Sequence, residues 1–312
     1  VFGGTVLSKV TVNGNNANYS VEDDVIFNKL KTKIVYYPTS KTGNYVIPES
    51  VVEIGANVFE NKLISKITIG KNIALIGDFA FAGCENLTEI IFIDGETKLS
   101  IGNNAFQNTA ITKLALPSRT AEIGEMAFAD CVKLESVSFS EKITVIKKET
   151  FVGCKKLKTV TLPVSLTAIE ENAFAYCESI ESIVIPAKET KLGEATNGSI
   201  TAFSMATSLK TITIDENNAK YASKDGVLYE KDEDGKLVTL LYCPIMNIPV
   251  DGTFIVPESV TRIETGAFAY NRGIEKIEFN NSGENLTFGS KVFASCEGLK
   301  EITLPDGMTV IG

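Results

Sequence analysis

Apolar residues in this chain recur in blocks of similar length, and a phenylalanine marks the same place in each block. The clearest block is LTAIEENAFAYCESIESIVIP, residues 166–186, and the two blocks before it, residues 120–140 and 143–163, repeat its pattern. Nine phenylalanines set the register, and most are 22 to 29 residues apart: Phe59, Phe81, Phe106, Phe128, Phe151, Phe174, Phe203, Phe268 and Phe293. Repeats of this length are typical of solenoid architectures.

Each block contains two segments with the pattern of a short β-strand. One follows the phenylalanine, as in LKTVTLP (157–163), where polar and apolar residues alternate and a proline that cannot donate a ladder hydrogen bond ends the strand. The other precedes it, as in SLTAIE (165–170). Between them, the AFxxC segment predicts a single helical turn, which is too short to be stable alone.

A block of this size cannot bury its own apolar side chains, so neighbouring blocks must stack, phenylalanine on phenylalanine and strand on strand. The predicted fold class is a β-rich α/β solenoid. Its coils would be short parallel strands with one helical turn per coil, and two β-hairpin inserts would interrupt them.

The two inserts are related in sequence. They are NNANYSVEDDVIFNKLKTKIVYYP, residues 15–38, and NNAKYASKDGVLYEKDEDGKLVTLLYCP, residues 217–244. Asp234-Gly235 between β-prone runs predicts the tip of a hairpin. Each hairpin could supply a strand to the stack or project from it as a binding protrusion.

These patterns divide the chain into four segments within one continuous solenoid. Residues 1–45 form an N-terminal strand and hairpin insert, and 46–214 form a first block of coils. Residues 215–255 form the second hairpin insert, and 256–312 form a second block. The sequence ends in LPDGMTVIG, which begins the repeat pattern, so we expect the last coil to be truncated.

Five of the six cysteines occupy one place in the repeat, three residues after the phenylalanine: Cys84, Cys131, Cys154, Cys177 and Cys296. Cys243 lies in the second insert. An even count permits disulfides, and cysteines can bind metal, but no pair forms C-x-x-C. We predict that the five thiols join the nine phenylalanines in a buried structural ladder, as small apolar side chains.

Composition narrows the possible chemistry. The sequence has no histidine, which excludes Ser-His-Asp and Cys-His catalysis and histidine-ligated metals for this chain alone. The net charge of −9 disfavours nucleic acid and anionic membranes as partners, and no stretch has the roughly 18 apolar residues of a membrane span. The paired carboxylates Asp23-Asp24 and Glu170-Glu171 are typical of solvated turns or strands. We predict no cofactor, no metal, no membrane insertion and no enzymatic activity.

The repeated motif IGxxAFxxCxxLxxIxLP, with the DGVLY…YCP of the second insert, resembles the BspA-type leucine-rich repeat family of bacterial proteins. The resemblance covers about residues 10–312, although the Phe59, Phe106, Phe203 and Phe268 blocks lack the cysteine. It implies a right-handed leucine-rich repeat superhelix in a secreted or cell-surface protein. It also implies adhesion to host matrix proteins, host cells or other bacteria.

In such a solenoid, the strands after the phenylalanines line the concave side, and alternate side chains point outward. The predicted binding face is Lys66, Thr68, Glu89, Ile91, Lys113, Ser136, Ser138, Thr159, Thr161, Ser182, Val184, Thr211, Thr213, Lys276, Glu278, Glu301 and Thr303. This face offers no aromatic anchor, whereas the inserts are rich in tyrosine. Tyr36, Tyr37, Tyr229 and Tyr242 are therefore a second set of candidate contacts.

The sequence thus favours a non-enzymatic interaction module that binds a protein of a host or of a bacterial surface. A passive stalk within a longer surface protein is the alternative, because threonine and valine on the face are also simply good strand formers. A monomer is expected, although the sequence does not determine the oligomeric state.

Overall fold

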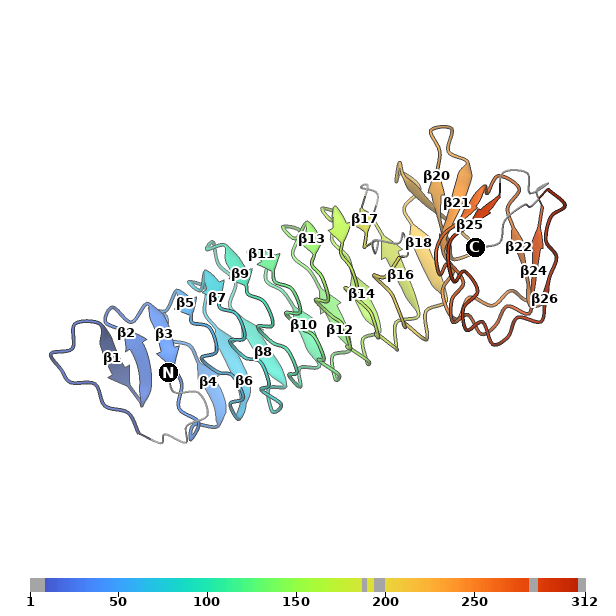
Figure 1. The fold of residues 1–312 in the computed structure, drawn as a ribbon. Helices are drawn as coiled ribbons and strands as arrows, with labels where there is room; N and C mark the ends of the chain where they lie inside the picture. Colours follow the sequence, from blue (N-terminus) through green and yellow to red (C-terminus); the bar gives the residue numbers. More distant parts are fainter. Residues whose placement is uncertain (1–8, 187–189, 194–199, 281–285, 308–312) are drawn as a thin grey trace. The chain divides into compact units, whose positions relative to one another are not determined.

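The computed structural model describes residues 9–186, 190–193, 200–280 and 286–307. Over these residues the chain forms β-strands joined by turns, and no helix (Figure 1). The chain divides into two compact units, residues 1–165 (unit 1) and 166–312 (unit 2). This division differs from the block boundaries expected from the sequence, which stay a prediction. The long loop before Phe203 and the truncated last coil lie partly outside the described residues.

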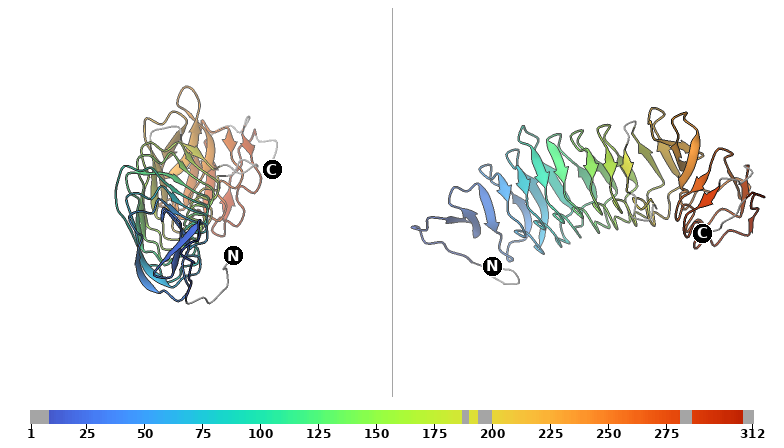
Figure 2. Two further views of the ribbon diagram at one scale, coloured as in Figure 1. Left: turned by 90° about the vertical axis from the view of Figure 1, so that its left-hand side faces the viewer. Right: turned by 45° about the horizontal axis from the view of Figure 1, so that its top comes forward.

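Unit 1 contains two rows of short parallel strands (Figures 1 and 2). The first row begins with β4 (Gly43–Val46), which follows the insert, and continues with the strands that follow the phenylalanines: β6 (Ile64–Ile69), β8 (Glu89–Phe92), β10 (Lys113–Ala115), β12 (Ser136–Ser138) and β14 (Thr159–Thr161). The second precedes them: β5 (Glu53–Ile54), β7 (Leu75–Ile76), β9 (Leu99–Ile101), β11 (Thr120–Ile123) and β13 (Val145–Ile146). Each paired strand lies beside its equivalent one coil further on, such as Ser136 beside Thr159. Both strand predictions are confirmed.

Unit 2 repeats this arrangement. Its first-row strands are β16 (Ser182–Ile185), β18 (Thr211–Ile214), β22 (Thr253–Val256), β24 (Lys276–Phe279) and β26 (Glu301–Ile302). Its second-row strands are β15 (Ala168–Ile169), β17 (Lys191–Leu192), β23 (Arg262–Ile263) and β25 (Thr287–Phe288). Leu192 pairs with Ile169 in parallel register and provides the buried apolar anchor that the sequence pattern did not identify for the Phe203 coil.

Both inserts supply strands to the stack, as the first alternative predicted. In unit 1, β1 (Tyr19–Glu22), β2 (Val25–Asn28) and β3 (Lys33–Tyr36) are antiparallel, and β3 pairs in parallel with β5. In unit 2, β19 (Tyr221–Lys224), β20 (Val227–Lys231) and β21 (Leu237–Tyr242) do the same, and β21 pairs with β23 (Figure 1). Asp23 and Asp24 both have positive φ, as a two-residue type I′ turn requires.

The phenylalanines form the predicted ladder inside each unit. In unit 1 the rings of Phe59, Phe81, Phe106, Phe128 and Phe151 stack with centroids 4.7, 4.9, 5.3 and 5.5 Å apart and planes within 7° of parallel. In unit 2, Phe174 stacks on Phe203. All of these rings are buried, whereas Phe293 near the end of unit 2 is half-buried.

The prediction of one helical turn per coil is wrong. The segment around each phenylalanine is a series of tight turns whose N–H groups point to the next coil, as in Phe59 N–H to the Ala80 carbonyl at 2.8 Å and Phe81 N–H to the Ala105 carbonyl at 2.7 Å. A helix would use these N–H groups within its own coil. The residues two before and two after the phenylalanine have positive φ, as at Asn57 and Asn61, so the backbone cannot continue as a right-handed helix.

Glycines after the second-row strands let neighbouring coils approach closely. A Cβ atom on Gly124 would lie 2.5 Å from the Asn103 nitrogen, and one on Gly77 would lie 2.6 Å from the Ala56 nitrogen. These are backbone atoms, which cannot move aside without shifting a coil. The glycine in the repeat is therefore required by coil spacing.

The buried cation Arg119 fills an irregularity in unit 1. The first row is interrupted between β8 and β10, which belong to separate sheets. Beside this interruption the Arg119 guanidinium is fully buried and donates to the carbonyl oxygens of Thr97 (3.1 Å) and Gly70 (2.9 Å). Arg119 therefore ties together the loops of three successive coils, a role that no sequence pattern indicated.

We expect Gly124→Ala to destabilise the protein by about 1–3 kcal/mol, because the added methyl group overlaps the backbone of the adjacent coil. Gly70→Ala is the matched control, since a Cβ there meets nothing within 4 Å. Denaturant unfolding of both variants measures the difference. Equal stability of the two variants would contradict the spacing argument.

We expect Phe151→Ala to cost about 3–5 kcal/mol, because it leaves a cavity in the ring ladder. Phe79→Ala is the control, because the Phe79 side chain is 39% exposed and lies outside the ladder. Thermal unfolding of the two variants measures this. A similar loss of stability in both would contradict a larger contribution of the ladder rings.

Candidate interaction surface

The predicted binding face points outward, and none of its seventeen residues is buried. In most first-row strands the alternate residues are buried or half-buried, such as Val137 between Ser136 and Ser138, whereas Ile302 in β26 is exposed. The half-exposed members are Lys66, Thr68, Ile91, Ser136, Thr211, Lys276 and Glu278, and the others are exposed. The strand alternation therefore places these side chains as expected, while ligand binding by them stays a prediction.

Several charged members of this face pair with one another across neighbouring strands. In unit 1, Lys66 Nζ lies 3.0 Å from a Glu89 carboxylate oxygen. In unit 2, Lys276 Nζ lies 2.8 Å from Glu301 and 3.0 Å from Glu278, and its hydrogen bonds to these two carboxylates raise the pKa of Lys276. Exposed pairs of this kind contribute little to stability. A partner that used these charges would first have to break the pairs.

The last two first-row strands of unit 1, β12 and β14, present outward side chains that are neutral and carry hydroxyl groups. Ser136 lies beside Thr159, and Ser138 beside Thr161, in parallel register. Among the described residues, these four hydroxyls have no hydrogen-bond partner. They form two short rows whose members are about 4.8 Å apart, the spacing between neighbouring strands. In unit 2, Ser182 and Thr211 continue this type of pairing.

The four insert tyrosines proposed as contacts are core residues in this structure. Tyr36, Tyr37, Tyr229 and Tyr242 are all buried. The Tyr37 ring packs 4.6 Å from Phe59 and so begins the ring ladder of unit 1, and burial raises the pKa of Tyr37 to about 12. The Tyr242 hydroxyl donates to the Phe203 carbonyl at 3.3 Å. Their aromatic surface is used in packing the inserts onto the coils, so it is not available to a partner.

The cysteines are free thiols, and five of the six are buried. Four of the repeat cysteines, Cys84, Cys131, Cys154 and Cys296, share one contact. Each donates to the carbonyl of the phenylalanine one coil earlier, as Cys84 does to Phe59 at 2.9 Å and Cys131 to Phe106 at 3.2 Å. Burial raises the pKa of the Cys131 thiol from 9.0 to about 11. Because a nucleophilic cysteine needs a lowered pKa, these thiols are structural.

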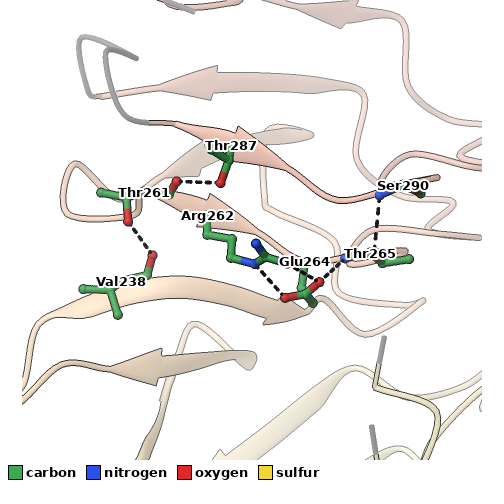
Figure 3. A network of polar contacts seen from close by, with 7 residues as sticks. All are labelled: Val238, Thr261, Arg262, Glu264, Thr265, Thr287 and Ser290. Atoms are coloured by element: carbon green, nitrogen blue, oxygen red, sulfur yellow. Dashed lines mark hydrogen bonds and ion pairs between the residues drawn. The ribbon is translucent and has the colours of Figure 1, made fainter. Parts of the chain in front are cut away.

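Among the described residues, Glu264 in unit 2 is the acidic residue classed as buried, with 7% of its surface exposed (Figure 3). Its oxygens accept from Arg262 Nε at 2.9 Å, from Arg262 Nη2 at 3.1 Å and from the Thr265 N–H at 3.0 Å. Burial alone would raise the pKa of Glu264, but these hydrogen bonds outweigh it, and the pKa lies below its ordinary value. The carboxylate accepts three hydrogen bonds and holds the turn after β23.

The described residues contain no cluster of three or more Cys, Asp or Glu side chains arranged to hold a metal ion. Their structure also includes no helix long and apolar enough to span a membrane.

The family model for the BspA type leucine rich repeat region matches the chain in six copies, over residues 31–135, 99–224 and 252–312. No curated protein matches the sequence. A leucine rich cell surface protein from Faecalibacterium prausnitzii A2-165 is similar in structure, with a TM-score of 0.74 and 27% identity, over 95% of this chain and 79% of that one.

Two other solved structures show the same fold. The pneumococcal vaccine antigen PcpA is 24% identical, with a TM-score of 0.59, over 96% of this chain and 72% of that one. A leucine-rich repeat protein from Bacteroides ovatus is 21% identical, with a TM-score of 0.54, over 94% and 80%. The chain thus shares its architecture with bacterial repeat proteins from several species.

The thiols predict a loss of stability in alkaline solution. Between pH 9 and 11 the unfolded chain releases the Cys131 proton while the folded chain retains it, so the free energy of unfolding falls as pH rises. We expect the loss between pH 8 and 10 to be about 1 kcal/mol smaller in Cys131→Ala than in the parent chain. Denaturant unfolding at the two pH values measures it, and an equal loss in both proteins would contradict the assignment.

Proposed function

The chain belongs to the BspA-type leucine rich repeat family, and on that premise we propose that it is a non-enzymatic interaction module of a secreted or cell-surface protein. The observation that carries the proposal is the first-row face, where hydroxyl rows are exposed and have no hydrogen-bond partner among the described residues. The partner class is protein, from a host matrix or from a bacterial surface, because a long regular face suits a macromolecule better than a small molecule.

The proposed location is supported by likeness to another protein. The Faecalibacterium prausnitzii structure is described as that of a leucine rich cell surface protein, and its alignment with this chain covers most of both. Surface exposure would place the first-row face in contact with other cells and their matrix. Adhesion is therefore the role that we propose for the module.

A non-enzymatic role is supported by what the carboxylates do. Glu264 accepts hydrogen bonds from Arg262 and Thr265, and Asp23 and Asp24 form a hairpin turn. General acid–base catalysis needs a carboxylate within reach of a substrate proton. These groups instead hold local structure.

A passive stalk is the second candidate function, and one observation favours it. Lys66 pairs with Glu89, and Lys276 with Glu301, so part of the face is occupied in stabilising its own ladder. A stalk would need no free face, whereas an adhesin would lose function when the face is altered.

The double substitution Ser138→Arg and Thr161→Arg should separate these functions. Both residues are exposed, so we expect the stability to change by no more than about 0.5 kcal/mol. We expect binding to immobilised matrix proteins to fall at least about tenfold, because two long cations would cover the hydroxyl rows.

The matched control is Leu75→Arg with Val145→Arg, which alters outward positions of the second row in the same unit. Binding is measured by titrating the chain over a panel of matrix proteins and whole bacteria. Absence of binding across the panel, or equal loss in both double variants, would count against an adhesive first-row face.

A further inference from the structure

The residue two places after each ladder phenylalanine lies on an edge of the solenoid and is held in the left-handed conformation. In unit 1 this row is Asn61, Gly83, Asn108, Asp130 and Gly153, all with φ between 54° and 74°. Glycine, asparagine and aspartate are the residues that adopt this conformation most readily. The row in unit 1 therefore follows the preference of the backbone.

The same row in unit 2 departs from that preference. Its members include Tyr176 (φ 59°), Met205 (φ 57°) and Tyr270 (φ 64°). A left-handed residue with a large side chain costs about 1 kcal/mol or more relative to glycine or asparagine. In this row, unit 2 thus carries a backbone cost that unit 1 does not. Unit 1 carries a similar cost two residues before the phenylalanine, at Phe79 (φ 55°) and Met126 (φ 54°).

Packing within the protein does not explain these tyrosines. The side chains of Tyr176 and Tyr270 are 50% and 48% exposed. Among the described residues, neither ring contacts another aromatic ring and neither hydroxyl has a hydrogen-bond partner. Of the insert tyrosines named above, all four are buried. The exposed aromatic surface of unit 2 is therefore on this edge, which the sequence pattern did not indicate.

Hydrogen bonds fix the order of the coils along the edge. Tyr176 N–H donates to the Ser204 carbonyl at 2.8 Å, which places Met205 one coil further on. The Tyr242 hydroxyl bonds the Phe203 carbonyl, and Cys243 N–H donates to the Ala267 carbonyl at 2.7 Å, so one insert turn lies between Met205 and Tyr270. Three such steps span roughly 14 Å. One standard protein interface, of about 800 Å² per partner, covers both tyrosines.

The two units also differ in net charge. Unit 2 has 22 Asp and Glu against 12 Lys and Arg, a net charge of −10. Unit 1 has 17 against 18, a net charge of +1. The negative charge of the chain is therefore carried by the unit that presents the tyrosines. An excess of this size attracts cationic partners and accelerates their association.

We propose that the edge formed by Tyr176, Met205 and Tyr270 is a docking site for a cationic protein segment with apolar side chains. Tyrosine and methionine are enriched at the centres of protein interfaces, where tyrosine is a frequent hot spot. The negative electrostatic potential of unit 2 attracts the basic segment to the protein, and the tyrosines bind the apolar side chains of that segment. This inference rests on the proposed interaction function and identifies a second surface and a partner class for it.

A glycan is less suited to this edge than a protein. Met205, between the two tyrosines in this row, offers sugar hydroxyls neither an amide nor a carboxylate group. Such polar groups stand in the equivalent row of unit 1, at Asn61, Asn108 and Asp130. The acidic excess of unit 2 also gives a neutral glycan no advantage.

The test uses a random 12-residue peptide library displayed on phage and selected on the full chain at low ionic strength. We expect the enriched peptides to carry a net positive charge with aromatic or large aliphatic residues. The double variant Tyr176→Asn, Tyr270→Asn should bind synthetic copies of these peptides at least about tenfold more weakly. Its stability should equal or exceed that of the parent, because asparagine accepts the left-handed conformation.

Phe79→Asn is the matched control. Phe79 is 39% exposed and also left-handed, with φ 55°, but it lies in unit 1. The control should bind the peptides as the parent does, and raising the salt concentration should weaken binding of the parent. Absence of enrichment, enrichment without positive charge, or equal binding by the tyrosine variant would overturn the proposal.

Two further outcomes separate this inference from the proposed function. If the tyrosine variant still binds matrix proteins and the Ser138 and Thr161 variant does not, the adhesive face stands and the docking edge is confined to basic segments. If the tyrosine variant instead loses binding on a glycan array while peptide binding is unchanged, the assignment of a protein partner is wrong.

Discussion

Every feature of this fold depends on the contact between one coil and the next. A coil cannot bury its phenylalanine or satisfy its N–H groups alone, so both are completed by its neighbour. This requirement acts on three sides at once, in the first strand row, in the second and in the turns around the phenylalanine. The turns cannot become helical because a helix would use the same N–H groups internally. Their left-handed residues, the close-packed glycines and the thiols that donate to the preceding coil all follow from the spacing.

The inward side chains are buried between neighbouring coils. Binding therefore depends on side chains that do not contribute to stacking. Two sets meet this condition: the hydroxyls of β12 and β14 on the first-row face, and the large residues on the turn edge of unit 2. The first set adds no conformational strain, because serine and threonine are accommodated well in strands. The second is held at unfavourable backbone angles, where asparagine or glycine would serve the fold better. A cost that the fold does not require is a stronger indication of a role than exposure alone.

Much of the architecture could be predicted from the sequence, and the misses have physical causes. The phenylalanine register, both strand rows and the strand-supplying hairpins follow from periodicity, because the same spacing that repeats in sequence repeats in space. The AFxxC pattern predicts a helical turn wrongly because a short local pattern does not show whether an N–H group bonds within its own coil or to the next one. Composition suggests Tyr36, Tyr37, Tyr229 and Tyr242 as contacts wrongly because it does not show which side of a hairpin faces the coils.

The sequence by itself determined the family, the stacking register and the absence of histidine chemistry, since each depends on residue identity and spacing alone. The tertiary structure decided which polar and aromatic groups remain available. It buried the insert tyrosines, paired Lys66 with Glu89 and Lys276 with Glu301, and left Tyr176 and Tyr270 exposed. The physical reason is that availability depends on neighbours one coil away, more than twenty residues distant along the chain, and on backbone angles that only the assembled stack imposes.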